Sequence, residues 1–398
     1  MIGRIINNIK GDKYIWYVVL ILSAFSLLLV YSSTRSLAYR DEQGNTEYYL
    51  FKHGFILSIG LFIIYFVHRI DHRYFSRIAQ MMLLVSIPLL LYTKFFGVKI
   101  NDASRWIRIP GGLTFQSSDF AKLALIMYTA RMLSKKQGVI KNMKEVVIHI
   151  MLPIVVICGL IMLDNLSSAA ILFMTCIVVL FIGRVSTKFI MAIVGGGILM
   201  AGMIFAASWF LVNDHGRADV WIQRIKSWTN PDVKSDDFYQ QRQANIAIAK
   251  GGLFRIAPGK STQCNFLPDA FSDFIYATLI EEYGLIGGAF ILFLYLLFMW
   301  RIIILVKNSP RAFGALMAVG LGVSLVLQAI IHMGVNVHLL PNTGITLPFI
   351  SWGGSSIWFN AFALGIILSV SRHNQEREAG KPKAPMKEKQ KVIDEIHG

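Results

Sequence analysis

Long apolar runs alternate with short polar connections along most of the chain. A helix needs roughly 20 apolar residues to cross a bilayer, and sliding-window hydropathy sets the bounds of such runs. The predicted spans are residues 14–32, 53–68, 78–96, 117–133, 146–163, 168–183, 188–212, 273–300, 312–335 and 355–371. We therefore expect an all-α polytopic membrane protein with ten transmembrane helices, in one membrane domain over residues 14–371.

The composition agrees with this pattern and excludes ordinary soluble proteins. The chain is 55% hydrophobic and 16% charged, with a mean hydropathy of +0.55. The first apolar run has no small-residue cleavage site after it, so it is typical of a signal anchor rather than a cleaved signal peptide. Three cysteines, of which two lie in apolar runs, do not form a disulfide framework.

The net charge of +16 is concentrated in alternate connections. Lys and Arg cluster before the first span, after spans two, four, six and eight, and in the tail. The other side carries only Arg35, Arg40, Lys52, Lys94, Lys99, Arg105 and Arg108 in its short connections. The positive-inside rule therefore predicts that residues 1–13 and the tail are both cytoplasmic. Basic residues in these positions face the anionic lipids of the inner leaflet. The net charge is therefore explained by membrane orientation, and we expect no nucleic-acid binding.

The tail, residues 372–398, is charged and contains proline, so we predict that it is disordered. Docking of a partner is the alternative role for it.

The predicted topology places the long polar loop, residues 213–272, outside the cytoplasm. No phosphate-binding glycine loop follows a strand in this sequence, so a soluble nucleotide is not the expected substrate. Within the loop, residues 221–243 alternate aromatics with Arg and amides such as Gln240, which suits contacts with sugars and headgroups. An amphipathic helix on the bilayer surface is the alternative. Residues 247–261, rich in Gly, Lys and Arg, are predicted to form a mobile loop.

Residues 267–288, LPDAFSDFIYATLIEEYGLIGG, join this loop to the eighth span. Pro268 suits the first turn of a helix, and Asp269 and Asp273 would then share a face. Asp273 would stand at the membrane surface, with Glu281 and Glu282 carried inside. An ionisable group at such a place indicates function because burying charge in lipid is costly. Simple capping of a helix by the two aspartates is the alternative.

A second polar stretch, residues 101–122, precedes the fourth span. Asp119 and Lys122 are three residues apart and can pair on one helix face. Trp106 between basic neighbours is typical of the membrane interface. Arg105 and Lys122 could bind a diphosphate there. A stabilising ion pair with headgroup-facing arginines is the alternative.

Residues 340–356, LPNTGITLPFISWGGSS, contain too much Pro and Gly for a regular helix. Such backbone survives at membrane depth only when it is packed in protein or lines a wet cavity. We predict a re-entrant segment over residues 337–355 that covers a polar cavity. A plain connecting loop is the alternative, but the segment is too apolar for a solvated one.

Several of these stretches together resemble the SEDS family (shape, elongation, division and sporulation), polytopic peptidoglycan glycosyltransferases that include FtsW and RodA. The resemblance covers nearly the whole chain and rests on SRWIRI, QSSDFAKL, YQQRQANIAIAKGGLF, LPDAFSDFIYATLIEEYG and LPNTGITLPFISWGGSS. The short loops resemble the division member FtsW more than RodA. This sequence departs from the family pattern with SDF for TDF, QSSD for QPSE, LDNLSSA for QPDLGTA, His332 for Asn, and APGKS in the glycine loop.

What the resemblance implies is polymerisation of lipid II at the outer face of the cytoplasmic membrane during septal wall synthesis. Asp273 matches the essential aspartate and would act as the general base of an inverting displacement. The residues we assign to substrate binding are Arg105, Trp106, Asp119, Lys122, Gln240, Ser351 and Ser355. A divalent cation, Mg or Mn, bridging Asp273 and the diphosphate is compatible with hard-metal chemistry. Asp164 stands one residue before the position of a further family acid, which Asn165 occupies.

The resemblance also implies a class b penicillin-binding transpeptidase and other divisome proteins as partners, with the chain in the inner membrane at the septum. The rival hypothesis is a lipid II flippase, since broken backbone and intramembrane charge are common in transporters. A flippase should show inverted repeats and acids near mid-membrane, and we see no convincing repeat. A scaffold that binds the transpeptidase is a third possibility.

Overall fold

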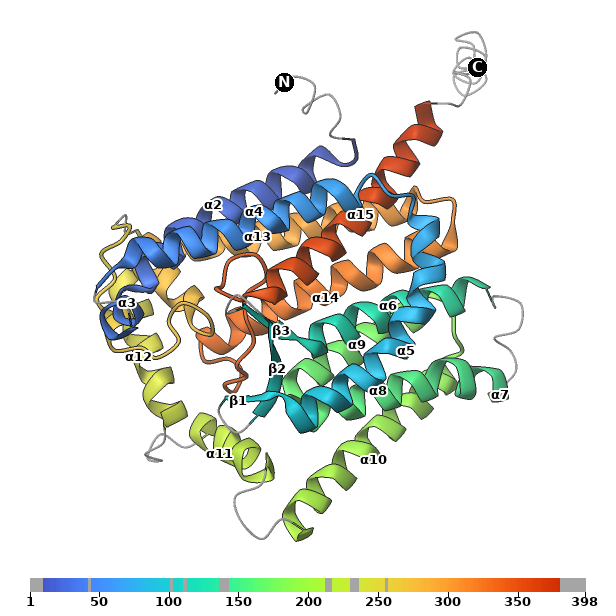
Figure 1. Cartoon of the computed structure of the whole chain (residues 1–398), viewed down its shortest axis with the longest axis horizontal. Coiled ribbons are helices and arrows are strands. Elements are labelled where there is room, and N and C mark those ends of the chain that lie inside the picture. Colours follow the sequence, from blue (N-terminus) through green and yellow to red (C-terminus); the bar gives the residue numbers. More distant parts are fainter. Residues whose placement is uncertain are drawn as a thin grey trace, which may run out of the picture.

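Long helices run side by side through the structure, a computed structural model that describes residues 10–41, 44–100, 103–109, 113–135, 143–211, 217–229, 236–254 and 257–379 (Figure 1). The bundle helices are α2 (Lys13–Ser33), α4 (Thr46–Val67), α5 (His72–Phe96), α6 (Ser117–Lys135), α7 (Met143–Val146), η1 (Val147–Met151), α8 (Leu152–Met162), α9 (Leu166–Ile182), α10 (Thr187–Leu211), α13 (Ile275–Lys307), α14 (Ala312–Asn336) and α15 (Ser355–Ala379). Each predicted span coincides with one of these helices, or with the continuous α7–η1–α8 run. Among the described residues, six helices are long and apolar enough to cross a membrane.

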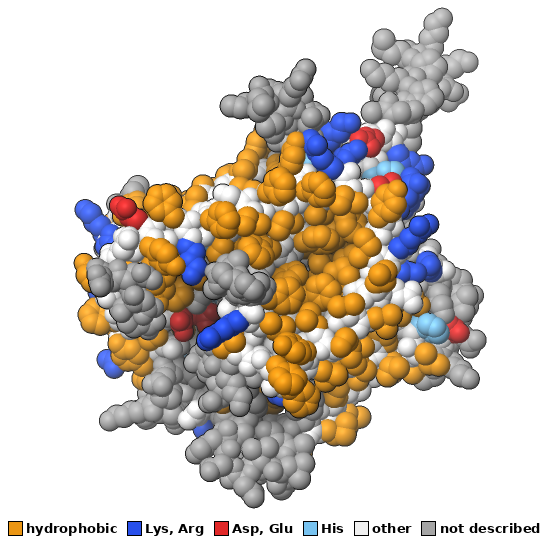
Figure 2. All heavy atoms as spheres, in the orientation of Figure 1, with side chains coloured by type: hydrophobic (Ala, Val, Ile, Leu, Met, Phe, Trp, Pro, Cys, Tyr) orange, Lys and Arg blue, Asp and Glu red, His pale blue; other side chains and the backbone are white. Residues whose placement is uncertain are grey.

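Helix α14 lies inside the bundle and packs against α13, α6, α9 and α15. The outer helices keep large apolar side chains exposed, as α4 does with Phe51, Phe55, Phe62 and Phe66. Orange apolar atoms cover the flank of the molecule in Figure 2. Exposed apolar surface of this extent marks a membrane-facing surface. The fold is therefore a mostly helical, multi-pass membrane fold, with α14 at its centre.

Basic side chains gather at one end of the bundle. Figure 2 shows Lys and Arg concentrated at the end from which the last turns of α15 project. The N-terminal segment is tied to the same end, because Asp12 N–H donates to Ser371 Oγ at 2.9 Å and Gly11 N–H donates to Gln375 Oε1 at 3.0 Å. The two ends of the described chain therefore meet on the basic side.

One small sheet corrects the all-α prediction. Strands β1 (Val98–Ile100), β2 (Ala103–Ile109) and β3 (Leu113–Gln116) form an antiparallel sheet in the order β1-β2-β3, between α5 and α6. Trp106 pairs with Gln116, and Ile107 pairs with Phe115. The aromatic and β-branched residues of RWIRI favour a strand. Arg105 and Ile107 lie on one face of β2, and Trp106 and Arg108 lie on the other. The interface stretch that we identified in the sequence is thus a strand with one Arg on each of its faces.

The region between α10 and α13 is also more ordered than predicted. It contains α11 (Arg217–Thr229), α12 (Asp236–Gly251) and the short 3-10 helix η2 (Gln263–Asn265), and it lies with α3 (Arg35–Asp41) at the end away from the basic residues (Figure 1). Residues 247–251, assigned to a mobile loop, are the end of α12. The prediction of a mobile loop was wrong there, because α12 packs along α13.

The two glutamates of α13 hold this region in place. Both are buried, and Glu281 accepts hydrogen bonds from Thr262 N–H at 3.0 Å and from the Ser261 hydroxyl. Glu282 accepts one from the Ser32 hydroxyl of α2. At Gly284 the helix breaks at a φ of 69°, and the next amide, Leu285 N–H, bonds to Gly252 O at 2.9 Å. The bonds to Glu281 fix the loop, because buried carboxylates require partners. Glu282 is bonded through Oε1 alone, and its Oε2 is buried without a hydrogen-bond partner.

An ion pair at the basic end is expected to matter for stability. Asp12 accepts from Tyr14 N–H at 2.9 Å, which caps α2, and from Arg301 Nε and Nη2 at 2.8 and 2.5 Å. Replacing Asp12 with Ala leaves a half-buried guanidinium unpaired and α2 uncapped, so we expect a loss of about 3 kcal/mol. Thermal unfolding in detergent, followed by intrinsic fluorescence, measures this as a lower Tm. Glu376→Gln is the matched control, since loss of this exposed carboxylate, which pairs with Lys10 and Arg372, should cost less than about 1 kcal/mol. Equal shifts in the two variants would contradict the argument.

Candidate active site

Asp273 lies in a tight turn that precedes α13. The helix predicted from Pro268 does not form, because Asp269 takes a left-handed conformation with a φ of 55° and α13 starts only at Ile275. Asp273 N–H nevertheless donates to Asp269 O at 3.0 Å. The two aspartates therefore stay one turn apart, as predicted, but in a turn outside the long helix.

Polar residues of α14 hold this turn from behind. Asn336 Nδ2 donates to Asp273 O at 3.0 Å, and its Oδ1 accepts from Ala277 N–H at 3.0 Å in the first turn of α13. His332 Nδ1 lies 2.6 Å from Ile345 O, and Gln328 Nε2 donates to Thr346 O at 2.9 Å. One face of α14 thus supports both Asp273 and the irregular segment that follows α14. We did not predict this role, although Gln328, His332 and Asn336 are spaced by four in an apolar span, which was the available signal.

The segment from Pro341 to Gly354 has no helix and packs inside the protein. Leu347, Phe349 and Ile350 are buried, which excludes a solvated loop. Gly344 has a φ of +59°, and a Cβ atom there would lie 3.4 Å from Asp273 Oδ2. Glycine adopts this left-handed conformation without strain, and at this position the backbone comes within van der Waals reach of the carboxylate. Whether the segment re-enters the membrane stays a prediction.

Ser351 fastens this segment to the turn. Its hydroxyl donates to Ser272 O at 2.7 Å and accepts from Leu347 N–H at 2.8 Å, and Trp352 N–H donates to Phe271 O at 2.9 Å. Ser351 was assigned to substrate binding, but these two internal bonds indicate a role in positioning the backbone beside Asp273.

The environment of Asp273 raises the pKa of its carboxyl to about 6. Burial is the largest cause, and the nearby Asp269 carboxylate adds to it; the Ser272 hydrogen bond, Arg105 and Arg224 act in the opposite direction. A carboxylate with a pKa near 6 is ionised at neutral pH and is a stronger base than an ordinary aspartate. Arg224, on α11, is a further site residue that we did not predict.

Arg105 reaches the site from β2. Its Nε and Nη2 donate to Asp164 O at 3.0 and 2.8 Å, and it lies close enough to act electrostatically on Asp273. The Asp164 carboxylate itself pairs with Lys94 at 2.9 Å, while Asn165 caps α9 by accepting from Ser168 N–H at 3.1 Å. Residues 163–169, LDNLSSA, depart from the family pattern, and in this chain their backbone positions Arg105.

Asp119 and Lys122 occupy a neighbouring cavity. They pair at 2.8 Å on α6, as predicted, and line the cavity with Gln328, Phe359 and Asn360. Gln328 also bonds the irregular segment, so this side chain links the cavity to the segment that carries Gly344.

The remaining predicted residues lie at the edges. Gln240 Oε1 on α12 accepts from Asn342 Nδ2 at 3.3 Å, beside the stretch that carries Gly344. Ser355 Oγ accepts from Gln116 N–H at 3.0 Å and joins β3 to α15. Trp106 follows Arg105 in β2 and so points to the opposite face of the sheet. The structure thus places Asp273 and Gln240 against one segment, with Arg105 in electrostatic reach of Asp273. Ser355 bonds β3 instead, and Trp106 lies on the other face of β2.

Comparison with known proteins agrees with this architecture. The FtsW/RodA/SpoVE family model, described as "Cell cycle protein", matches residues 12–376. The probable peptidoglycan glycosyltransferase FtsW of Coxiella burnetii is 31% identical over 377 residues, covering 92% of this chain and 98% of the relative. Stage V sporulation protein E of Bacillus subtilis is 31% identical over 374 residues, covering 92% and 98%.

Two solved structures share the fold. A chain from a peptidoglycan synthase complex that coordinates polymerisation and crosslinking superposes with a TM-score of 0.71 at 22% identity, covering 92% of this chain and 98% of that one. The rod shape determining protein RodA of Thermus thermophilus gives 0.65 at 23% identity, covering 92% and 97%. Taken with the match over residues 12–376, these similarities show that the chain belongs to the FtsW/RodA/SpoVE family of cell cycle proteins.

Proposed function

We propose that this chain is a peptidoglycan glycosyltransferase that polymerises lipid II, with Asp273 as its general base. The observation that carries the proposal is the environment of Asp273. Its carboxylate is half-buried, has a pKa of about 6 and lies beside the Gly344 backbone, and Arg105 and Arg224 act on it electrostatically. The relatives named peptidoglycan glycosyltransferase FtsW, at 30–32% identity over most of the chain, support it. The names of these relatives also disfavour a lipid II flippase. A flippase moves its substrate without chemistry, so it would not need a general base.

The reaction is a single inverting displacement. Asp273 takes the proton from the 4-hydroxyl of the acceptor sugar, and that oxygen forms a bond to the anomeric carbon of the donor. The bond from the anomeric carbon to the diphosphate breaks, and its electron pair leaves with the undecaprenyl diphosphate. Arg105, with Lys122 in the neighbouring cavity, stabilises the charge that develops on the leaving group. An α-linked donor then gives a β-linked glycan.

A divalent cation, Mg or Mn, at Asp273 stays a prediction. Among the described residues, the one group of three or more metal-ligating side chains lies at Asp71, not at Asp273. A cation at Asp273 would therefore depend on oxygen atoms of the diphosphate, and no step above is routed through it.

The proposed setting is the inner membrane of a dividing cell. Ten helices cross the bilayer, both termini lie in the cytoplasm, and Asp273 lies at the outer surface, where the lipid carrier delivers its substrate. The basic end in Figure 2 supports this orientation through the positive-inside rule. A class b penicillin-binding transpeptidase and other divisome proteins are the proposed partners at the septum.

One reconstitution tests the function. Purified chain in vesicles with lipid II on the outer leaflet, with and without its transpeptidase, should produce glycan strands that resolve on a gel. A flippase would redistribute lipid II between leaflets without producing strands. Absence of strands with the transpeptidase present would overturn the proposal.

The raised pKa of Asp273 predicts a pH profile for polymerisation. The base must be ionised, so kcat/KM should fall tenfold per pH unit below about pH 6. Asp269→Asn removes a negative charge that raises the pKa of Asp273. The acid limb of the profile, where the rate falls as the base is protonated, should therefore move to lower pH. Initial rates from pH 4.5 to 8 in both proteins measure the shift. An unchanged limb in Asp269→Asn would show that another group controls the profile.

A further inference from the structure

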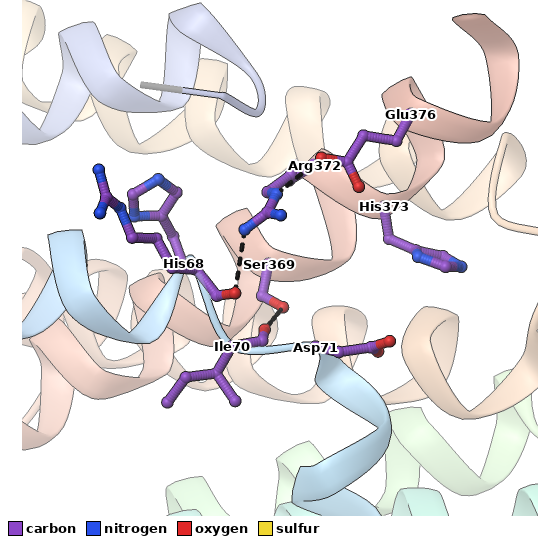
Figure 3. Close-up of a pocket in the computed structure, with 8 residues that line it drawn as sticks. His68, Ile70, Asp71, Ser369, Arg372, His373 and Glu376 are labelled. Carbon is purple, nitrogen blue, oxygen red and sulfur yellow. Dashed lines mark hydrogen bonds and ion pairs between the residues drawn. The ribbon is translucent and has the colours of Figure 1, made fainter. Parts of the chain in front are cut away.

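At the basic end of the bundle, two histidines and an aspartate come together. Asp71 caps α5, His72 is the first residue of that helix, and His373 lies on α15. One donor atom of each side chain lies within 4.8 Å of the other two. The imidazole rings stand 4.9 Å apart between centroids at 68°. Figure 3 shows the side chains of Asp71 and His373 extending to the same side of the pocket.

Two ring nitrogens in this group make no hydrogen bond. His72 Nδ1 and His373 Nε2 are buried without a hydrogen-bond partner, and His72 is only 2% exposed. His72 Nδ1 lies 3.5 Å from Asp71 Oδ1, beyond good hydrogen-bond length. Buried ring nitrogens normally find a partner, so their lone pairs point to a ligand that binds there.

We propose that Asp71, His72 and His373 bind a divalent transition metal, with Zn²⁺ as the preferred ion. Two imidazole nitrogens and one carboxylate oxygen form a common zinc donor set. With bonds of about 2.0–2.2 Å, donor atoms on one tetrahedral ion lie roughly 3.4 Å apart. Each donor therefore needs to move by about an ångström, which side-chain rotation provides. A cavity of about 80 Å³ beside the group leaves space for water as the fourth ligand. Asp71 and His373 line it together with Arg69 and Arg372, whereas His72 does not reach it.

Neighbouring arginines limit the affinity. Arg73 Nε lies 3.3 Å from Asp71 Oδ2, and Arg311 acts electrostatically on His72. Their charge opposes a cation, so we expect micromolar binding instead of the tighter binding of a closed structural site. The ion would join the start of α5 to the end of α15. His373 is 18 residues from Ser355, or about 27 Å along the helix, so this site is separate from the turn at Asp273.

The test is zinc binding by the purified full chain. The protein carries a histidine-free affinity tag, is stripped with EDTA, and is dialysed against 0.1–100 µM Zn²⁺, values chosen to span micromolar affinity. Metal per chain is measured by mass spectrometry. We expect one saturable equivalent and a Tm that rises by about 3 °C or more with zinc. No saturable binding below about 100 µM would overturn the proposal.

Two variants locate the site. Asp71→Asn keeps a residue that caps helices as well as Asp does, and His373→Gln changes a partly exposed side chain. Each should weaken zinc binding at least tenfold, and the Tm of each without metal shows that it is folded. His149→Gln is the matched control, because His149 pairs with Glu145 at 3.5 Å on the separate α7–η1 run. Wild-type zinc affinity in both site variants would place any bound zinc elsewhere and reject the site.

Discussion

Replacing Asp273 with Asn is expected to lower lipid II polymerisation by about 1,000-fold, the middle of the range for loss of a general base. The amide has the size of the carboxylate but cannot take the proton of the acceptor hydroxyl. The Ser272 hydrogen bond to the carboxylate can be kept by an amide oxygen. The backbone of residue 273 makes the other bonds, to Asp269 O and from Asn336 Nδ2, so the turn should be unchanged. Initial rates with purified protein in vesicles, together with the transpeptidase, measure the loss.

A matched control separates chemistry from charge. Glu47→Gln makes the same carboxylate-to-amide change at an exposed residue in the first turn of α4 and should keep the wild-type rate. Asp273→Asn should also keep the wild-type Tm within about 1 °C, since no backbone contact is lost. If Asp273→Asn polymerised lipid II at near wild-type rate, the assignment of the base would be wrong.

Hydropathy predicted the helices well because it reports a local property. Residues 78–96 and 312–335 were predicted as spans, and α5 and α14 occupy 72–96 and 312–336. Lipid-facing and buried surfaces are both apolar, so a run of apolar residues indicates a span whatever it packs against. The short sheet before α6 was missed because its strands lie in a stretch whose charge and aromatics also suit the membrane interface.

The site was predicted only in part because its geometry depends on contacts between distant segments. Asp273 was identified from its position after a polar loop, but Asn336, which holds it, is 63 residues away. The Glu281 and Glu282 pair was predicted to be carried into the membrane, and its hydrogen bonds to Thr262 and Ser32, which come from other segments, were not predicted. Sequence spacing identifies which residues share a helix face, and it does not identify the backbone amides that will meet them.

Arg105→Lys is expected to lower kcat/KM for polymerisation by about 30-fold, and Arg105→Gln by more, because both weaken stabilisation of the departing diphosphate. Lysine keeps the charge but has no planar fork to bond Asp164 O through two N–H groups, as Arg105 does at 3.0 and 2.8 Å. The charge of Arg105 also favours ionised Asp273, so Arg105→Gln should move the acid limb to higher pH. Arg105→Lys should leave that limb in place, and rate profiles over pH measure both effects.

The strand itself supplies the control for this prediction. Arg108 is an exposed arginine three residues along β2 and therefore projects from the opposite face. Arg108→Lys makes the same chemical change in the same sheet and should leave both kcat/KM and the pH profile unchanged. Equal losses in the two variants would mean that the sheet contributes only general positive charge at the membrane surface. A loss confined to residue 105, with the pH shift confined to its uncharged variant, would show that one guanidinium serves both the base and the leaving group.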